Sequence, residues 1–310
     1  MGNSLFSPDS PQAQAITHLS IIVGIVMLAI FVLITVLVLY AVVKFRHRPG
    51  DSEPRQVFGN SRVEKAWTIA ALLTVTVLFI FTIRTMHSAD RTPAPGRKPD
   101  LEIIAHQWWW EARYPHSGVV TANEIHIPVG KAWLVRLKSD DVIHDWWVPD
   151  LGRKMDAIPG HPNEFWIQAD NPGTYLGTCA EFCGAGHAWM RIRVIAQSEA
   201  GFKSWEQHQL EVPPQPTSGE SVAGSKLFHE LTCDDCHTVA GTSANGDIGP
   251  DLTHVASRET LAAGRLKNTP ENLAKWISDP QKWKPGSHMP DFNFTPTQVS
   301  DLVAYLETLK

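Results

Sequence analysis

The chain has 310 residues, enough for two domains of ordinary size or a few small modules. Its formal net charge is −5 and no basic patch of note appears, so nucleic acid is not an expected partner. The four cysteines form two close pairs, a spacing that favours cofactor sites over a scattered disulfide framework.

Two apolar runs near the N-terminus predict a transmembrane hairpin over residues 16–84. A polar segment, 1–15, comes first. Residues 16–43 are almost entirely apolar, show no polar face and are long enough to cross a hydrocarbon core of about 30 Å. The second run, 66–83, is near the lower length limit, so a buried soluble helix stays open for that run alone.

The charges around these runs predict their orientation. The loop between them is rich in lysine and arginine, whereas residues 1–15 contain neither. Positively charged loops stay in the cytoplasm, so both termini and everything after the hairpin are expected outside. Glu64 then lies at the cytoplasmic mouth of the second helix, where an ordinary interfacial charge is the simplest interpretation.

A proline-containing connector lies at 85–99. Over residues 100–210 the sequence pattern then changes to short strand-like runs. Gly, Pro, Asn and Asp separate them, which predicts an antiparallel all-β sandwich or barrel. The runs lie at 101–104, 133–138, 164–167, 174–176 and 190–194. The tryptophans at 108–110 form an aromatic cluster before this frame, and core packing is the commonest role for such residues.

A loop before the last predicted strand gathers soft metal ligands. Its candidates are Cys179, Cys183, His187 and Met190. Thiolate, thioether and imidazole together suit copper in electron transfer. A single blue-type copper needs one cysteine, so two cysteines suggest two metal ions bridged by two sulfurs. His144, after the 133–138 run, is the candidate for a second imidazole, and a disulfide is the alternative for the cysteine pair taken alone.

A proline-rich linker at 211–218 leads into a helical region with a second cofactor motif. Cys233, Cys236 and His237 follow the attachment pattern of c-type haem, in which both thiols bond the porphyrin and the histidine ligates iron. A thioredoxin-like pair or a small metal site is the alternative. The βαβ pattern of a thioredoxin is missing from the sequence, which favours haem.

The second axial ligand of such an iron is expected downstream. Met289 is the one methionine after the motif, and His288 beside it is the competitor. Thr269 and Thr295 carry helix-start signals, the second with capping-box spacing. The last helix then presents one apolar face, formed by Val299, Leu302, Leu306 and Leu309.

Residues of about 15–200 resemble the cytochrome c oxidase subunit II family. The similarity rests on the copper loop, on the segment 139–146 and on the segment 154–160. Residues 219–310 are similar to a complete class I cytochrome c, and the order resembles oxidases of the caa3 kind. The resemblance implies a multidomain membrane protein: a two-helix transmembrane hairpin, an all-β cupredoxin-like barrel and an all-α class I cytochrome c domain.

The resemblance also implies a binuclear copper centre, CuA. Both thiolates would bridge the two coppers, each copper would take one imidazole, and a thioether and a backbone carbonyl would complete the shells. The implied ligands are His144, Cys179, the carbonyl of Glu181, Cys183, His187 and Met190. The carboxylate of Glu181 would reach a Mg²⁺ ion shared with subunit I, and a solvated loop acid is the alternative.

Two further positions take roles from the resemblance. Trp108 matches the electron-entrance tryptophan, which the family places on the surface above the copper, where an exposed indole offers a docking contact. Glu64 matches the entrance of a proton pathway into subunit I. The family often has a second acid two residues earlier, where this chain has Arg62, and that departure weakens the assignment.

The implied function is electron relay in a proton-pumping terminal oxidase of the bacterial inner membrane. A soluble cytochrome c or a quinol-oxidising complex would reduce the haem, and electrons would pass to CuA and then to subunit I. Oxygen would be reduced there, at haem and CuB, because the ligand sets of this chain leave no open position. Subunit III is a further expected partner. The tether raises the effective concentration of donor over acceptor without tight docking.

Two alternatives come from other functional classes. A membrane-anchored copper chaperone for oxidase assembly also uses two cysteines and a distant histidine, but it has no use for Met190 or a haem domain. The CuA subunit of a nitric oxide reductase would carry a similar copper site. The sequence of this chain does not distinguish a nitric oxide reductase from an oxidase, because the difference lies in the catalytic partner.

Overall fold

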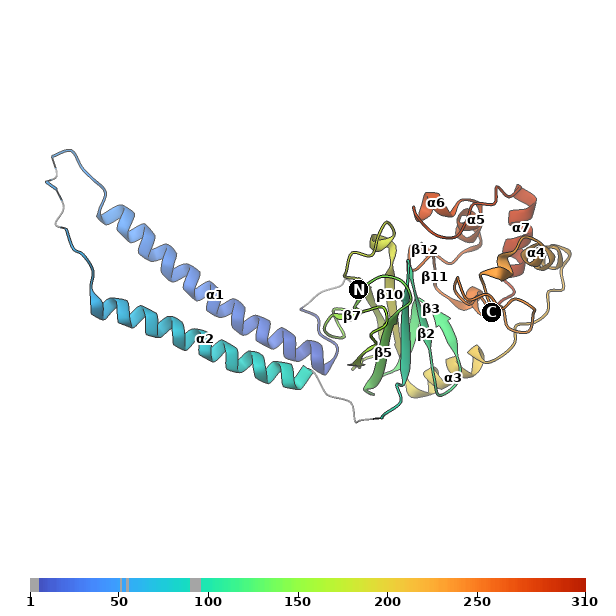
Figure 1. Cartoon of the computed structure of the whole chain (residues 1–310), viewed down its shortest axis with the longest axis horizontal. Helices are drawn as coiled ribbons and strands as arrows, with labels where there is room; N and C mark the ends of the chain where they lie inside the picture. Colours follow the sequence, from blue (N-terminus) through green and yellow to red (C-terminus); the bar gives the residue numbers. More distant parts are fainter. Residues whose placement is uncertain (1–5, 51, 54–55, 90–95) are drawn as a thin grey trace. The chain divides into compact units, whose positions relative to one another are not determined.

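Helices α1 (Pro11–Lys44) and α2 (Ser61–Ala89) supply the first of two structural units, which covers residues 14–90 (Figure 1). The structure is a computed structural model that describes residues 6–50, 52–53, 56–89 and 96–310. The most apolar 18-residue windows of these helices have mean hydropathies of 3.3 and 2.3, and neither window is buried within the protein. A helix that is apolar all round and unburied suits a lipid environment.

Both helices extend beyond the apolar runs that predict them, 16–43 and 66–83. Mostly polar residues add more than a turn at the start of α1 and at both ends of α2, and the hydrophobic core of a membrane does not require them. Parts of the expected N-terminal segment and connector, residues 1–5 and 90–95, lie outside the described residues.

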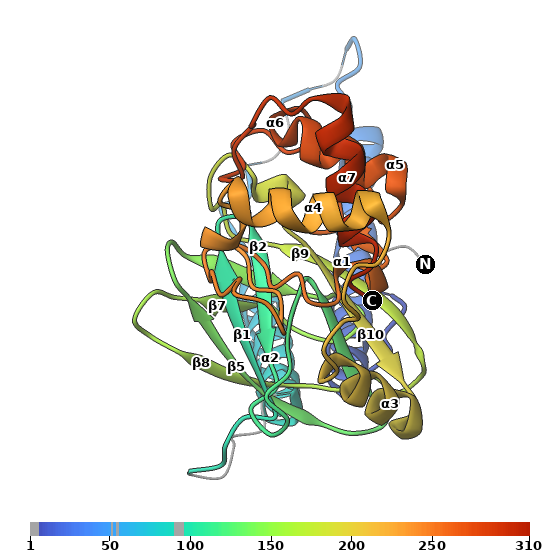
Figure 2. The same ribbon diagram turned by 90° about the vertical axis from the view of Figure 1, so that its right-hand side faces the viewer.

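The second unit contains a β-sandwich and a helical domain. Within residues 96–310, ten strands of the sandwich form two five-stranded sheets around one apolar core (Figure 2). In spatial order, the first sheet contains β3 (Val120–Ala122), β2 (Trp109–Arg113), β1 (Leu101–His106), β5 (Trp133–Ser139) and β8 (Asn163–Ile167). The second contains β4 (Glu124–Pro128), β10 (Arg191–Gln197), β9 (Gly173–Cys179), β6 (His144–Trp147) and β7 (Met155–Ala157).

The all-β fold is confirmed, but the expectation of a purely antiparallel frame is wrong. β1 pairs with β5 in parallel, with Ile103 opposite Leu137, and β10 pairs with β4 in parallel, with Val194 opposite Ile125. Strand alternation in a sequence reports which face is buried, as along β9 and β10. It does not report the direction of the neighbouring strand, which depends on longer connections.

The tryptophan cluster is part of the sandwich and does not precede it. Trp109 and Trp110 are the first residues of β2. Trp110 is fully buried and packs edge-on against Trp146 of β6, with ring centroids 5.3 Å apart. The core-packing interpretation therefore holds for Trp110.

A helix that the strand pattern does not predict closes this region. α3 (Glu199–Gln209) begins at Ser198, whose side chain accepts a hydrogen bond from the N–H of Gly201. Phe202 and Trp205 turn inward and pack against the ring of Tyr114. Its other positions are mostly polar, so the helix has too few apolar residues to stand out in sequence.

The helical domain follows the linker. Its α-helices are α4 (Gly219–Glu230), α5 (Pro270–Ser278), α6 (Pro280–Trp283) and α7 (Pro296–Leu306). Short elements complete the domain and the copper loop: η1 (His187–Trp189), η2 (Cys233–Asp235), η3 (Val255–Ser257), β11 (Thr260–Leu261) and β12 (Leu266–Lys267). Both predicted caps are confirmed, since Thr269 caps α5 and Thr295 forms a capping box with Gln298 at α7.

The core of the helical domain forms where α4 crosses α7 (Figure 2). The predicted face of α7 is buried there, and the rings of Phe228 and Tyr305 lie 5.6 Å apart. Gly224 permits the crossing, because a Cβ atom at this position would lie 1.9 Å from the carbonyl oxygen of Asp301. The backbones of the two helices therefore approach as closely as glycine allows.

We predict that Gly224→Ala destabilises the helical domain by about 1–3 kcal/mol, because the added methyl forces the two helices apart. Gly219→Ala in the same helix is the control, since a Cβ there meets no atom within 4 Å. Denaturant unfolding followed by far-ultraviolet circular dichroism measures both variants. Equal midpoints for the two variants would show that the crossing tolerates a side chain.

Candidate metal and haem sites

Strand pairing brings the predicted copper ligands together. His144 opens β6 and Cys179 ends β9, and these strands pair with Trp146 opposite Cys179. The loop after Cys179 returns to β10, where the N–H of Cys179 donates to the carbonyl of Met190 at 3.0 Å. Residues 35 positions apart therefore meet at one end of the sandwich.

Four side chains form a chain of short contacts at this end. The two sulfurs, Sγ of Cys179 and Sγ of Cys183, are 3.8 Å apart. Nδ1 of His144 lies 3.9 Å from the first sulfur, and Nδ1 of His187 lies 3.7 Å from the second. His144 is fully buried and both cysteines nearly so.

The sulfur separation excludes a disulfide in this structure, because an S–S bond is about 2.05 Å long. It suits a bridging metal instead. Metal–thiolate bonds are about 2.3 Å and metal–imidazole bonds about 2.0 Å for zinc, so one ion can bond both sulfurs, or one sulfur and one imidazole, at these separations. The donor set is soft and thus fits copper.

The two thiols behave as a pair. The hydrogen bond between Cys183 and Cys179 lowers the pKa of Cys179 and raises that of Cys183. Burial alone lowers the pKa of His144, but its hydrogen bonds to Asp141 and Cys179 raise it. Metal binding would release protons from this group, because thiolate and neutral imidazole are the ligating forms.

The remaining copper-loop candidates lie around this cluster. Met190 is fully buried directly after η1. The backbone carbonyl oxygen of Glu181 is 3.3 Å from Sγ of Cys179. The side chain of Glu181 is exposed, which leaves its carboxylate free to face another subunit.

Asp141 is a site residue that the sequence reading does not single out. Its carboxylate accepts a hydrogen bond from Nε2 of His144 at 2.8 Å, which leaves Nδ1 of that ring directed at the sulfurs. Such an outer carboxylate fixes the orientation of a metal-ligating histidine. An acid three residues before a candidate histidine is the signal that could have found it.

Trp108 is buried, so the expectation of an exposed indole is wrong. Its side chain is 7% exposed, and its Nε1–H donates to the carbonyl of Cys183 at 2.9 Å. The ring lies against Gly186, where a Cβ atom would come within 2.4 Å of it. Residues of the helical domain cover the rest, including His288, whose ring centroid is 5.3 Å from that of Trp108.

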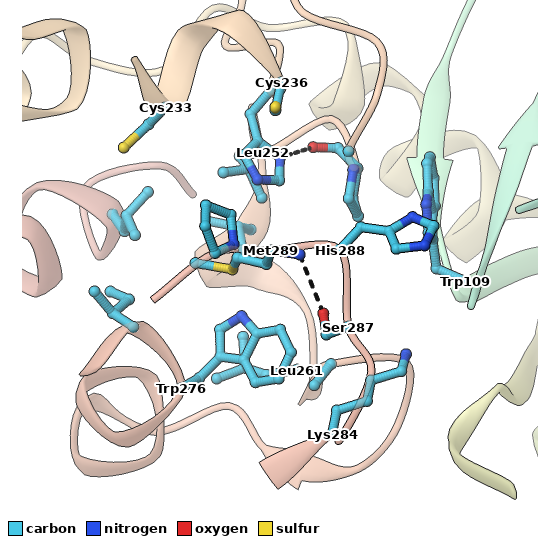
Figure 3. A pocket seen from close by; sticks show the side chains of 18 of the residues that line it. Trp109, Cys233, Cys236, Leu252, Leu261, Trp276, Lys284, Ser287, His288 and Met289 are labelled. Atoms are coloured by element: carbon cyan, nitrogen blue, oxygen red, sulfur yellow. Dashed lines mark hydrogen bonds between the residues drawn. The ribbon is translucent and has the colours of Figure 1, made fainter. Parts of the chain in front are cut away.

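The haem motif lines a large apolar cavity in the helical domain. Cys233, Cys236 and His237 reach this cavity of about 400 Å³ from η2, and Met289 reaches it from the loop before α7 (Figure 3). A cavity of this size with mostly apolar walls is typical of a cofactor pocket. The structure therefore brings together all four residues that the sequence assigns to a haem.

The surroundings of His237 suit an iron ligand. Nδ1–H donates to the carbonyl of Pro250 at 2.7 Å, so the lone pair of Nε2 remains available. Burial lowers the pKa of His237 and keeps the ring neutral. Gly249 packs against the imidazole so closely that a Cβ there would lie 2.6 Å from it, which fixes the ring position.

Figure 3 distinguishes the two candidates for the second axial position. The sulfur of Met289 points into the cavity, whereas the ring of His288 turns the other way, toward Trp109. The backbone N–H of Met289 donates to Oγ of Ser287 at 3.3 Å, and this contact helps to hold the loop. The orientation favours Met289 as the ligand.

Glu64 lies in the first turn of α2. Its carboxylate accepts the backbone N–H of Asn60 at 3.1 Å, while Oδ1 of Asn60 accepts the N–H of Arg62 at 3.1 Å. These contacts satisfy backbone N–H groups at the start of the helix, which have no partner within it. Glu64 therefore stabilises the start of α2, whatever else it does.

Three family models match successive parts of the chain. They are the transmembrane domain of cytochrome c oxidase subunit II at residues 2–86, its periplasmic domain at 117–197 and cytochrome c at 221–310. The first two support membrane anchoring with the sandwich on the outer face, and they indicate copper binding. The third indicates haem.

Several curated relatives align with most of this chain. A cytochrome c oxidase subunit 2 of Alkalihalophilus pseudofirmus is 36% identical, over 98% of this chain and 90% of that protein. Those of Bacillus sp. strain PS3 and Bacillus subtilis are 32% and 28% identical, over 86% and 99% of this chain and 80% and 92% of theirs. The chain therefore belongs to the cytochrome c oxidase subunit II family, as a membrane-anchored electron-transfer subunit of a haem–copper oxidase with its own cytochrome c domain.

Proposed function

We propose that this chain relays single electrons from an outer donor, by way of covalent haem c and binuclear CuA, to haem in subunit I. There oxygen is reduced to water and protons are pumped across a bacterial inner membrane. The observation that carries the proposal is the cluster of two free thiols and two imidazoles with neighbouring donor atoms 3.7–3.9 Å apart. When bound, the copper pair and the haem each supply a one-electron redox couple.

The copper ligands in this proposal come from a rigid frame. Cys179, Cys183, His144 and His187 would hold the copper, and both thiolates would be shared between the two ions. Met190 and the carbonyl of Glu181 complete the shells. Paired strands fix His144 and Cys179, and Asp141 fixes the ring of His144. Ligands held this firmly move little when the charge on the metal changes, and so they keep the barrier to electron transfer low.

In the helical domain, Cys233 and Cys236 would hold the porphyrin covalently, and His237 and Met289 would ligate its iron. Pro250 and Gly249 orient His237. With these ligand sets in place, the haem and the copper would carry electrons and not bind oxygen, and we therefore assign the oxygen chemistry to subunit I and its CuB.

The proposed division of the chain follows the sites: a hairpin at 16–84, a copper domain at 100–210, a linker at 211–218 and a haem domain at 219–310. Subunits I and III are the proposed membrane partners. A soluble cytochrome c or a quinol-oxidising complex is the proposed donor.

Two assignments extend the function to ions and protons. The exposed carboxylate of Glu181 would complete a Mg²⁺ site at the boundary with subunit I. Glu64 would admit protons to subunit I from the cytoplasmic side. Its capping contact with Asn60 is compatible with that role, since one carboxylate oxygen is enough to make it.

A copper chaperone accounts less well for the structure. It needs an accessible site that releases one copper, whereas His144, Cys179 and Cys183 are buried beneath the loop. Nor does it account for a complete haem cavity in the same chain. A nitric oxide reductase would retain both features and differ only in its catalytic subunit.

Purification of the native complex tests the acceptor directly. We expect the complex to consume oxygen with reduced cytochrome c or quinol as reductant, and to acidify the outer medium when reconstituted in vesicles. Turnover with nitric oxide at a higher rate than with oxygen would replace the proposed function with the reductase alternative.

We predict that Met190→Leu keeps the fold but shifts the reduction potential of the copper centre, because a weak axial thioether tunes such sites. Potentiometric titration of the copper absorption in the full chain measures the shift. Met155→Leu, in β7 of the same sheet, is the matched control. An unchanged potential and an unchanged rate of electron transfer would show that Met190 is only a core residue.

A further inference from the structure

We propose that Lys284 of the haem domain and Glu124 of the copper domain are positioning residues, which fix the haem domain over Trp108. This inference rests on the proposed function, because it concerns how the two proposed redox sites are aligned.

The first observation is that the haem domain covers Trp108. On one side its indole packs against Gly186 and donates to the carbonyl of Cys183. On the other side lies the loop 284–290 of the haem domain, with the ring of His288 5.3 Å away. A Cβ atom on Gly286 would come 2.9 Å from Cβ of Ala185, so the backbone of this loop lies directly on the copper loop.

The second observation is Lys284. This lysine belongs to the haem domain, is 4% exposed, and donates through Nζ to the backbone carbonyl of Trp108. Burial of an ammonium group is costly unless it is hydrogen-bonded. The copper domain supplies that acceptor. The contact therefore favours one docked position of the haem domain on the copper domain.

A second polar contact lies at the edge of the sandwich. Glu124 of β4 is 4% exposed, and its carboxylate accepts the N–H of Glu259 at 2.9 Å and the hydroxyl of Thr260. Arg193 of β10 pairs with the carboxylate of Glu259. In addition, the N–H of Arg191 donates to the carbonyl of Ala263 at 3.2 Å.

The contact between the two domains also brings the haem cavity next to Trp108. Its wall includes Gln107, Trp108, Trp109 and Asn123 of the copper domain beside the haem ligands. The cavity edge and the indole that is hydrogen-bonded to Cys183 are therefore neighbours. An external donor cannot reach Trp108 while the haem domain is seated, so it must deliver electrons to the haem domain.

Hydrogen exchange of the full chain with haem attached and copper removed tests the seating without any electron transfer. The reporter is the amide of Arg191, whose hydrogen bond goes to the carbonyl of Ala263 and to neither substituted side chain. We expect Lys284→Met and Glu124→Gln each to speed its exchange about tenfold, the factor for loss of one charged hydrogen bond. Lys282→Met, an exposed lysine two residues away, is the matched control and should leave exchange unchanged.

Electron transfer in the metal-loaded chain gives the second readout. Lys284→Met should slow the haem-to-copper step at least about tenfold while the absorption spectra of both centres stay as in the wild type. Wild-type exchange at Arg191 as fast as in an unprotected amide, or equal rates in all three variants, would overturn the seating. Missing copper or haem spectra would instead count against the proposed function and leave the exchange result valid.

Discussion

The pairing of β6 with β9 is the constraint on which the copper site depends. It sets Trp146 opposite Cys179 and so brings His144, at the start of β6, to within 3.9 Å of a sulfur that lies 35 residues later. The loop after Cys179 then needs only to fold back on itself. The N–H of Cys179 bonds the carbonyl of Met190, and that contact closes the loop at the entrance to β10. A slip of one residue in this register would turn either His144 or Cys179 to the other face of its strand.

A few local contacts also position the candidate ligands in the haem domain. A short 3₁₀ turn holds Cys233 and Cys236, while carbonyl and glycine contacts from the following loop orient His237. The crossing of α4 and α7 at Gly224 supplies the core beneath. Because the copper domain completes one wall of the cavity, the two redox sites depend on each other for alignment as well as on their own folds. A flexible tether alone would give proximity without this alignment.

Local chemistry was predictable from the sequence, and contacts between distant segments were not. Cys179, Cys183, His187 and Met190 lie within one loop, as Cys233, Cys236 and His237 lie within one motif, so residue type and spacing were enough to propose them. The caps at Thr269 and Thr295 are equally local. The parallel strand pairs, the helix α3 and the burial of Trp108 depend on tertiary packing. Lys284 is an ordinary lysine in the sequence and becomes a candidate only through its contact with the carbonyl of Trp108.

The central claim is that the sulfurs of Cys179 and Cys183 hold two copper ions between them. Metal analysis of the full chain, combined with paramagnetic resonance, tests it most directly. We predict two coppers per polypeptide with one unpaired electron shared between them, and loss of that signal in Cys183→Ser. Fewer than two coppers per polypeptide, with Cys179 and Cys183 joined by a disulfide, would contradict the account.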